Sequence, residues 1–355
     1  MTMTDEQRAL RDAVRGLLTK HADSSAVRRA ADQPRGYDEA LWRRLCDEVG
    51  VAALAIPEKF DGAGAGLAET QLVLHELGRT LAPAPLLGSA VLCGQLLVEL
   101  DDPDACARLL PALAAGTSIA ALAWTDGPWT PAETPFTVDG GAGRATVSGT
   151  GRFVLDGDIA DVLLVVARDT SGVGVYELAP GTVERTHTPT MDPTRRLATI
   201  TASGVPATRI GTGDATAAVE AAVRHATVAL AAEQVGAAER ILERTVDYTR
   251  TRVQFGRPIG SFQALKHRMA DLHVLVEAAR SAAAAAAGTI SAAAAHVWCS
   301  EALLTVAGEC IQLHGGIAIT WEHDAHLYFK RAHGSAQLFG QPLAHLPALA
   351  PEAGL

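Results

Sequence analysis

One long segment limits how this chain can fold more than any other feature. From Ala215 to Val253 the sequence has no proline and a single glycine, Gly236. At 1.5 Å rise per residue, an unbroken helix of ~38 residues would be nearly 60 Å long. The motif FGRPIGS then breaks the chain, and three further helical stretches follow at 262–288, 296–316 and 321–340. Long helices joined by short loops predict a C-terminal four-helix bundle over residues 213–355.

The rest of the chain divides into two parts with different periodicity. Residues 1–118 place apolar side chains at helical spacing, for example Leu10, Val14 and Leu17, and predict an N-terminal domain of short helices. Residues 119–212 contain short β-branched runs such as DVLLVVAR and VGVYEL, separated by Asp, Gly, Pro and Thr. This pattern is typical of an antiparallel sandwich or barrel, so the predicted fold is multi-domain: helical domain, middle antiparallel β domain, four-helix bundle.

Composition excludes several classes of function. The formal net charge is -10, so no global basic field exists to attract nucleic acid or anionic lipid. The five cysteines form no CxxC pair, which favours buried thiols in a reducing compartment. The charged N-terminus lacks an apolar signal core, and the Ala-rich run near residues 281–295 is too interrupted to span a bilayer. We therefore expect a cytoplasmic protein that inserts into no membrane.

The break between the long helices carries the first candidate site. Arg252 precedes a motif in which Phe255 is followed by Gly256 and, after a proline, Gly260. A guanidinium can pair bidentately with a pyrophosphate, and glycine lets the backbone approach a ligand. Phe255 could stack on a flat ring. The alternative interpretation is an ordinary helix C-terminus, with an arginine favoured by the helix dipole and a Gly/Pro stop.

Two later motifs can also be interpreted either as ligand sites or as ordinary structural features. Gln312 with Gly315 and Gly316 forms QLHGG, which alone is typical of a helix C-cap. The segment Glu322–His326 suggests a metal site, because His323 and His326 share a helix face at i and i+3. Two imidazoles without a placed carboxylate make a poor site, so we expect no metal here and favour a solvated or interface helix face.

Taken together, these motifs resemble the acyl-CoA dehydrogenase family of flavoproteins over nearly the whole chain. RTVDYTRTRVQFGRPIGSFQALKHRMAD is similar to one bundle signature of that family, and AGECIQLHGGIAITWEHDAHLYFKRA to a second. The family's order of domains matches the one read from periodicity. The resemblance implies FAD as cofactor, an acyl-CoA thioester as substrate, and α,β-dehydrogenation. A carboxylate takes the α-proton while the flavin accepts the β-hydride, and electron-transfer flavoprotein is the expected acceptor.

The resemblance also implies roles for individual residues. Arginine and neighbouring positions of the first signature reach the FAD of an adjacent subunit, and those of the second lie along its adenosine part. The residues that inherit these roles are Arg252, Gln254, Phe255, Phe262, Gln263, Gln312, Gly315 and Gly316. In the β domain, Thr125 and Phe153 match positions beside the chain's own flavin. Leu155 stands where the family carries a threonine, and leucine cannot donate a hydrogen bond to the flavin edge.

The catalytic carboxylate is the larger departure from the family. One branch places a glutamate just before the glycine of the last helical region, where this chain has His333 before Gly334. Another branch places it near the start of the first bundle helix, at a position that corresponds to Ala226. Glu233 lies two helical turns further on the same face and is the candidate base, although ~10 Å of axial offset is large for proton abstraction. The alternative for Glu233 is a structural partner inside the bundle.

Residues that serve a neighbour's flavin are thus kept, while those that serve the chain's own flavin edge and base are altered. This favours a partner-type subunit, lacking its own base, of a heteromeric acyl-CoA dehydrogenase. It resembles the shorter subunit of actinobacterial members, including those that act on steroid side-chain CoA esters. Three alternatives remain: a self-sufficient homotetramer that uses Glu233, a flavin oxidase or monooxygenase of the same fold, and a non-enzymatic helical scaffold.

Overall fold

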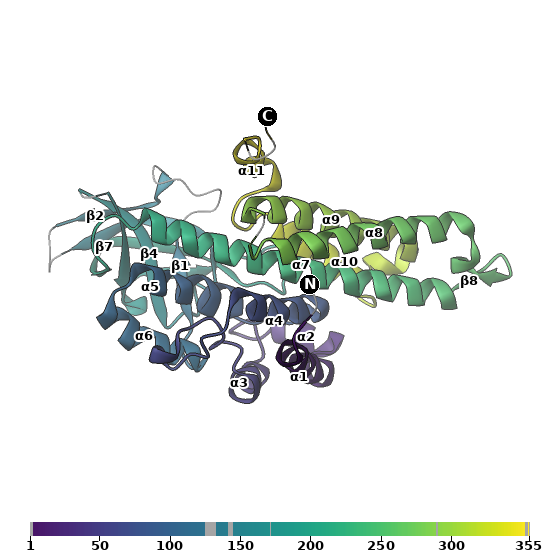
Figure 1. The fold of residues 1–355 in the computed structure, drawn as a ribbon, viewed down its shortest axis with the longest axis horizontal. Coiled ribbons are helices and arrows are strands. Elements are labelled where there is room, and N and C mark those ends of the chain that lie inside the picture. Colours follow the sequence, from purple (N-terminus) through teal and green to yellow (C-terminus); the bar gives the residue numbers. More distant parts are fainter. Residues whose placement is uncertain are drawn as a thin grey trace.

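The computed structural model describes residues 3–124, 133–140, 145–170, 172–288, 290–351 and 354. Short helices, a β domain and long helices follow one another along the chain, and Figure 1 shows the β domain at one end of an elongated molecule. The long helices extend away from it toward the opposite end. The predicted fold is confirmed in this order of elements, and the domain boundaries near residues 118 and 212 stay a prediction.

Short helices make up the first part of the structure. The capping box of Thr4 with Gln7 starts the first helix, since each side chain bonds the other residue's backbone N–H. Several following helices begin at aspartates, such as Asp23 and Asp38, whose carboxylates accept from the first-turn amides. The elements are α1 (Asp5–His21), α2 (Ser24–Ala31), α3 (Glu39–Arg44), η1 (Leu45–Val49), η2 (Glu58–Phe60), α4 (Leu67–Thr80), η3 (Leu86–Cys93), α5 (Gly94–Leu100) and α6 (Pro103–Ala114).

The middle part is a seven-stranded sheet with a closed core. Its elements are β1 (Ala120–Ala123), β2 (Phe136–Asp139), β3 (Thr146–Leu155), β4 (Val162–Asp169), β5 (Gly172–Leu178), η5 (Pro180–Thr182), β6 (Glu184–His187) and β7 (Leu197–Ile210). The order β1-β4-β2-β3-β7-β5 returns on itself because β4 also pairs with β5. The prediction of a purely antiparallel domain is wrong for two pairs, since β1 and β2 both run parallel to β4. Local sequence patterns cannot predict which strands pair, or in which direction, when the strands are this far apart in the sequence.

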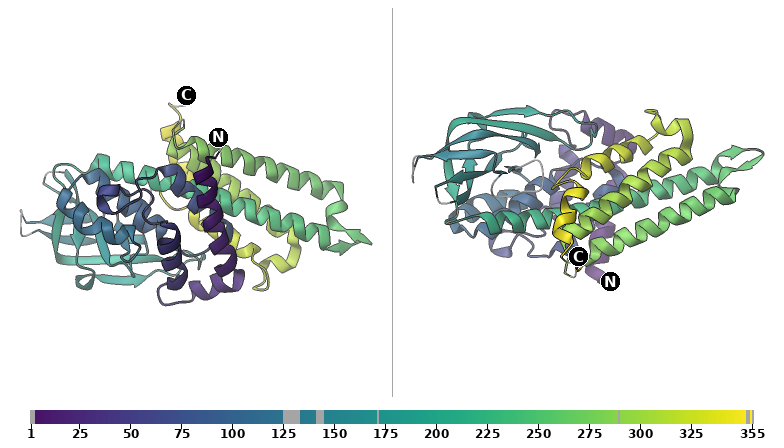
Figure 2. Two further views of the ribbon diagram at one scale, coloured as in Figure 1. Left: turned by 60° about the horizontal axis from the view of Figure 1, so that its bottom comes forward. Right: turned by 90° about the horizontal axis from the view of Figure 1, so that it is seen from above.

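Four helices form the bundle at the C-terminal end. The predicted long segment is the single helix α7 (Thr216–Thr251), whose 36 residues give a length of about 54 Å. The other bundle helices are α8 (Gln263–Ala285), α9 (Ala292–His314) and α10 (Ala325–Ser335). Connecting and terminal elements are β8 (Val253–Gln254), β9 (Arg257–Pro258), η6 (Ile259–Ser261), η7 (Gly315–Ile319) and α11 (Pro342–Leu349). Figure 2 shows α7 running from the β domain to the far tip.

Two glycines let α7 approach the N-terminal helix α4 very closely. A Cβ atom on Gly78 would lie 2.0 Å from the carbonyl oxygen of Glu233, and one on Gly236 would lie 2.0 Å from that of His75. The helices therefore meet backbone to backbone, with one glycine from each. This close crossing explains why the long helix contains a glycine at position 236.

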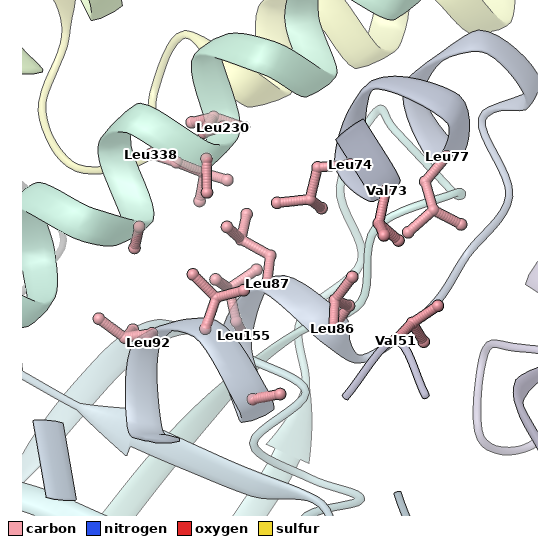
Figure 3. Packing of buried hydrophobic residues seen from close by; sticks show 14 of the residues in the cluster. Val51, Val73, Leu74, Leu77, Leu86, Leu87, Leu92, Leu155, Leu230 and Leu338 are labelled. Atoms are coloured by element: carbon pink, nitrogen blue, oxygen red, sulfur yellow. The ribbon is translucent and has the colours of Figure 1, made fainter. Parts of the chain in front are cut away.

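A continuous apolar core joins all three parts of the chain. Figure 3 shows Leu74 of α4, Leu87 of η3, Leu155 of β3 and Leu230 of α7 around one interior region. Each of these side chains is buried. Removal of this much apolar surface from water stabilises the junction of the β domain with the helices. The junction is also where the candidate catalytic residue lies.

One segment is long and apolar enough to cross a bilayer by length and composition alone. It spans Ala292–Ile319 with a mean hydropathy of 1.4. Its helix α9 packs against α7, α8 and α10. A helix at the centre of a bundle needs such a composition on several faces, so a single segment of this kind is weak evidence for membrane insertion.

Candidate functional site

The hairpin after α7 presents the first group of predicted cofactor residues to solvent. Arg252 caps α7, and its guanidinium has no hydrogen-bond or ion-pair partner among the residues that the structure describes. Gln254 of β8 pairs with Arg257 of β9, which leaves Phe255 and Gly256 as the two-residue turn. Both turn residues have positive φ, as the tightest hairpin turns require. A positive φ at phenylalanine is strained, and the side chain is 91% exposed.

Aromatic side chains gather at this tip of the bundle. The rings of Phe255 and Phe262 meet edge to face with centroids 6.1 Å apart. The guanidinium carbon of Arg257 lies 4.0 Å from the centroid of Phe262, within the range of a cation–π contact. Gln263 begins α8 beside them and is exposed. The tip therefore offers an unpaired cation, flat rings and the exposed amide of Gln263 to a molecule outside this chain.

The QLHGG motif lies at the same end of the bundle. Helix α9 ends at His314, because Gly315 adopts φ 68° and ψ -151°, and Gly316 continues into η7. The hydroxyl of Tyr248 donates to the carbonyl oxygen of His314 at 3.2 Å. Tyr248 precedes Arg252 by one helical turn. The structure thus brings the hairpin and the glycine turn, about 60 residues apart in sequence, to one end of the molecule, with Gln312 exposed beside them.

The Glu322–His326 segment has structural partners. The carboxylate of Asp324 accepts from Arg28 at 2.7 Å and pairs with Arg244 at 2.8 Å. The ring centroids of His323 and His314 are 4.3 Å apart with the planes tilted by 48°, and Nδ1 of His323 accepts from the backbone N–H that begins α10. In the ranges that the structure describes, no three His, Cys, Asp or Glu side chains converge as a metal site.

The predicted flavin-edge residues lie far from the hairpin. Phe153 sits at an irregularity of β3 with φ 54° and is 45% exposed, whereas Leu155 faces the buried junction with α7. Leu155 and Glu233 line one pocket. Glu233 and Arg252 are 19 residues apart on α7, which is about 28 Å along the helix. The hairpin residues and the flavin-edge residues therefore cannot surround the same ring system. The third predicted flavin-edge position, Thr125, lies outside the described residues.

Glu233 is 5% exposed and lies between two buried arginines. Its Oε1 accepts from Nη1 of Arg331 at 2.5 Å and also from Nη2 of Arg195. Arg331 donates further to Asp192 at 2.8 Å and to the carbonyl oxygen of Thr194 at 2.7 Å. Burial by itself lowers the pKa of Arg331, but the charges of Asp192 and Glu233 outweigh it and raise the pKa. The result is a buried charge network that joins α7, α10 and the loop before β7.

The pocket around this network is small. Its volume is about 30 Å³, which is room for one or two water molecules. Tyr37, Leu155 and Asp156 line it together with Arg195 and Glu233. Burial raises the pKa of Asp156 to about 7, against the opposing charge of Arg195. Because two buried guanidiniums donate to Oε1 of Glu233, this carboxylate is arranged as a charge partner.

Sequence reasoning missed Arg195, Arg331 and Asp156. Arg331 lies 98 residues from Glu233, and Arg195 lies 38 residues from it. No local periodicity links such positions. The sequence contained only an indirect signal. The arginine at 331 stands on a helix face that must be buried to complete the bundle, and a buried arginine needs a carboxylate partner.

Comparisons with known proteins agree with this arrangement. Residues 4–117 match the family model "Acyl-CoA dehydrogenase, N-terminal domain", and residues 214–342 match "Acyl-CoA dehydrogenase, C-terminal domain". The chain is 47% identical to the acyl-CoA dehydrogenase IpdE2 of Mycobacterium tuberculosis, covering 99% of this chain and 98% of that protein.

Two solved structures have a similar fold. One is a chain of the ChsE4-ChsE5 complex from Mycobacterium tuberculosis, with a TM-score of 0.91, 30% identity and coverage of 99% of this chain and 98% of that one. The other is a chain of the Tcur3481-Tcur3483 steroid ACAD G363A variant, with a TM-score of 0.87, 29% identity and coverage of 98% and 97%.

Proposed function

Because this chain belongs to the acyl-CoA dehydrogenase family, we propose that it is the partner-type subunit of a heteromeric, FAD-dependent acyl-CoA dehydrogenase. The heteromer removes hydrogens from the α- and β-carbons of an acyl-CoA thioester. In this assembly the chain contributes FAD contacts to its neighbour, and the neighbour supplies the catalytic carboxylate. Similarity to a two-chain complex and to a steroid ACAD supports a heteromer with a steroid-derived acyl-CoA.

One observation carries the proposal: Oε1 of Glu233 accepts from both Arg331 and Arg195, and the pocket beside this carboxylate is too small for a substrate. Proton abstraction from the α-carbon requires a carboxylate within hydrogen-bond reach of a bound substrate. The pocket beside Glu233 holds about 30 Å³, whereas ligand sites for small organic molecules measure roughly 300 Å³ or more. No acyl chain fits there without breaking the charge network.

The residues at the tip fit the cofactor of an adjacent subunit. The unpaired guanidinium of Arg252 can hold a pyrophosphate through two parallel hydrogen bonds. Exposed Phe255 offers a ring face, and Gly315 and Gly316 let backbone lie close to a flat ligand. Bound flavin supplies the acceptor for the β-hydride. On the chain's own side, Leu155 offers no donor to a flavin edge, which supports a role as the partner subunit.

The test is to produce the chain alone and together with a homologue encoded beside it. We expect FAD to be retained and bleached by acyl-CoA in the mixed assembly only. Arg252→Gln should reduce the FAD content of that assembly. Arg250→Gln is the matched control, because it lies about 200° around the same helix and is 72% exposed in its pair with Asp247.

Other outcomes identify the alternatives. Full flavin loading of the isolated chain with acyl-CoA-dependent bleaching would instead indicate a self-sufficient homotetramer. Steady oxygen consumption without an added acceptor would indicate an oxidase or monooxygenase, and absence of flavin in every mixture would indicate a scaffold. Electron-transfer flavoprotein is the proposed acceptor, and the cytoplasm the proposed compartment; both can be examined with the assembled protein.

A further inference from the structure

A second, larger cleft lies on the helical side of the molecule and has no role in the proposed dehydrogenation. It has a volume of about 530 Å³, within the usual range of sites for small organic ligands. Helices α1, α4, α7 and α10 and the segment that starts α2 line its walls. It shares no lining residue with the pocket around Glu233.

Guanidinium groups from three helices face this cleft. Arg240 and Arg244 lie one turn apart on α7, Arg15 comes from α1 and Arg79 from α4. The side chains of Arg15, Arg240 and Arg244 are 45%, 43% and 33% exposed. Arginine has five N–H donors. Arg240 contacts a carboxylate only at Glu243, through one nitrogen at 3.2 Å, so most of its donors remain available among the residues described.

The carboxylates that balance this charge are held in the walls. Glu76 is 2% exposed and accepts two hydrogen bonds from Arg15, at 2.7 and 2.9 Å, with a further contact to His75. Burial alone raises the pKa of Glu76, but the bonds from His75 and Arg15 lower it to about 2. Asp324, 6% exposed, is bound by Ser24, Arg28 and Arg244.

At the rim, the more exposed Asp23 is occupied as the N-cap of α2, where its carboxylate accepts from the backbone N–H of Ala26 at 2.7 Å and from Ser25. Each of these carboxylates therefore has hydrogen-bond donors from the protein itself, while guanidinium groups remain partly exposed toward the cleft.

Apolar atoms make up slightly more than half of the surface that lines the cleft, and Thr19, Thr80 and Tyr328 are among its polar residues. Leu18, Val27, Leu81 and Leu327 lie at the floor of the cleft, beneath this surface, and each is at most 3% exposed. An inorganic anion would use the cations and leave this surface in contact with water. A ligand with an apolar body and one anionic end would use both parts.

We propose that this cleft binds a soluble amphiphilic organic anion, a carboxylate or phosphate monoester whose apolar body lies over the floor formed by Leu18, Val27 and Leu327 and whose charged end pairs with Arg240 and Arg244. The ligand would connect the N-terminal helices to α7 and α10. Binding would stabilise the folded chain by mass action. This site is independent of FAD and of the proposed dehydrogenation.

The experiment titrates the full chain, alone and in its heteromer, with octyl phosphate by calorimetry. Inorganic phosphate, which has only the anionic group, and octanol, which has only the apolar body, serve as controls. We expect octyl phosphate to bind more tightly than either control and to raise the unfolding temperature. Arg240→Gln should weaken binding about tenfold, as expected for loss of one charge-assisted hydrogen bond, and Arg240→Glu more strongly. Arg250→Gln, on the same helix but outside the cleft, should bind like the unmodified chain.

Several results would overturn the proposal. These are absence of binding in both forms of the protein, equal affinity for octyl phosphate and octanol, equal affinity for octyl phosphate and inorganic phosphate, or the same affinity in Arg240→Gln and Arg250→Gln. Arg240 belongs to a half-exposed ion pair, so its variants should fold, and their unfolding curves verify this. A lipid headgroup in a membrane could present the same phosphate monoester, and vesicles of phosphatidic acid test this source. If the protein binds these vesicles but does not bind octyl phosphate, the ligand is not soluble and the proposal is refuted.

Discussion

Replacement of Glu233 by glutamine tests the charge network directly. Arg331 and Arg195, whose side chains are 5% and 9% exposed, both lose their shared anion in this variant. Breaking a buried pair by removal of one partner costs ~3–5 kcal/mol, because a charge is left uncompensated. Arg331 keeps Asp192 and Thr194, and the glutamine oxygen can still accept a hydrogen bond. We therefore expect the lower end, about 3 kcal/mol lost from the free energy of unfolding.

The assay is urea unfolding of the isolated chain, followed by dehydrogenation measured in the assembled heteromer. Glu220→Gln, on the exposed face of α7, is the matched control and should change stability by no more than ~0.5 kcal/mol. Arg331→Met should also destabilise. The double variant with Glu233→Gln should lose less than the sum, since both changes disrupt one interaction.

The activity of the assembled heteromer distinguishes a charge partner from a base. With Glu233 as a charge partner, the Glu233→Gln heteromer that does assemble should turn over at close to the normal rate. An unchanged free energy of unfolding combined with a hundredfold or larger loss of turnover would refute the reasoning and make Glu233 the catalytic base.

Two further predictions concern packing and pH. Gly236→Ala should destabilise by ~1–3 kcal/mol or more in urea unfolding, because its Cβ would meet the carbonyl oxygen of His75. Gly308→Ala, with open space around the new methyl, should be neutral or stabilising, and equal effects of the two would contradict the close crossing. Burial lowers the pKa of His296 to about 4, below the ~6.5 of an unfolded histidine, so stability present above about pH 6.5 should fall as the pH approaches 4, by up to ~3 kcal/mol. His296→Gln should flatten this part of the pH profile, and an unchanged profile would show that other groups control it.

Much of the helical architecture is determined by the sequence alone. The composition between Ala215 and Val253 allows little besides one long helix, and α7 spans Thr216–Thr251. The end of α9 follows from Gly315, because only glycine readily adopts its backbone angles. The motifs that suggest a dinucleotide are equally local. All of these features depend on residues a few positions apart, so the order of the amino acids is enough to predict them.

The tertiary structure alone decided the parallel pairing of β1 and β2 with β4 and the environment of Glu233. Whether a buried carboxylate is a base or a charge partner depends on which cations lie within about 3 Å of it. Those cations, Arg195 and Arg331, reach Glu233 from the loop before β7 and from another helix of the bundle. A periodic pattern records which face of an element is buried, but it does not record what lies opposite that face.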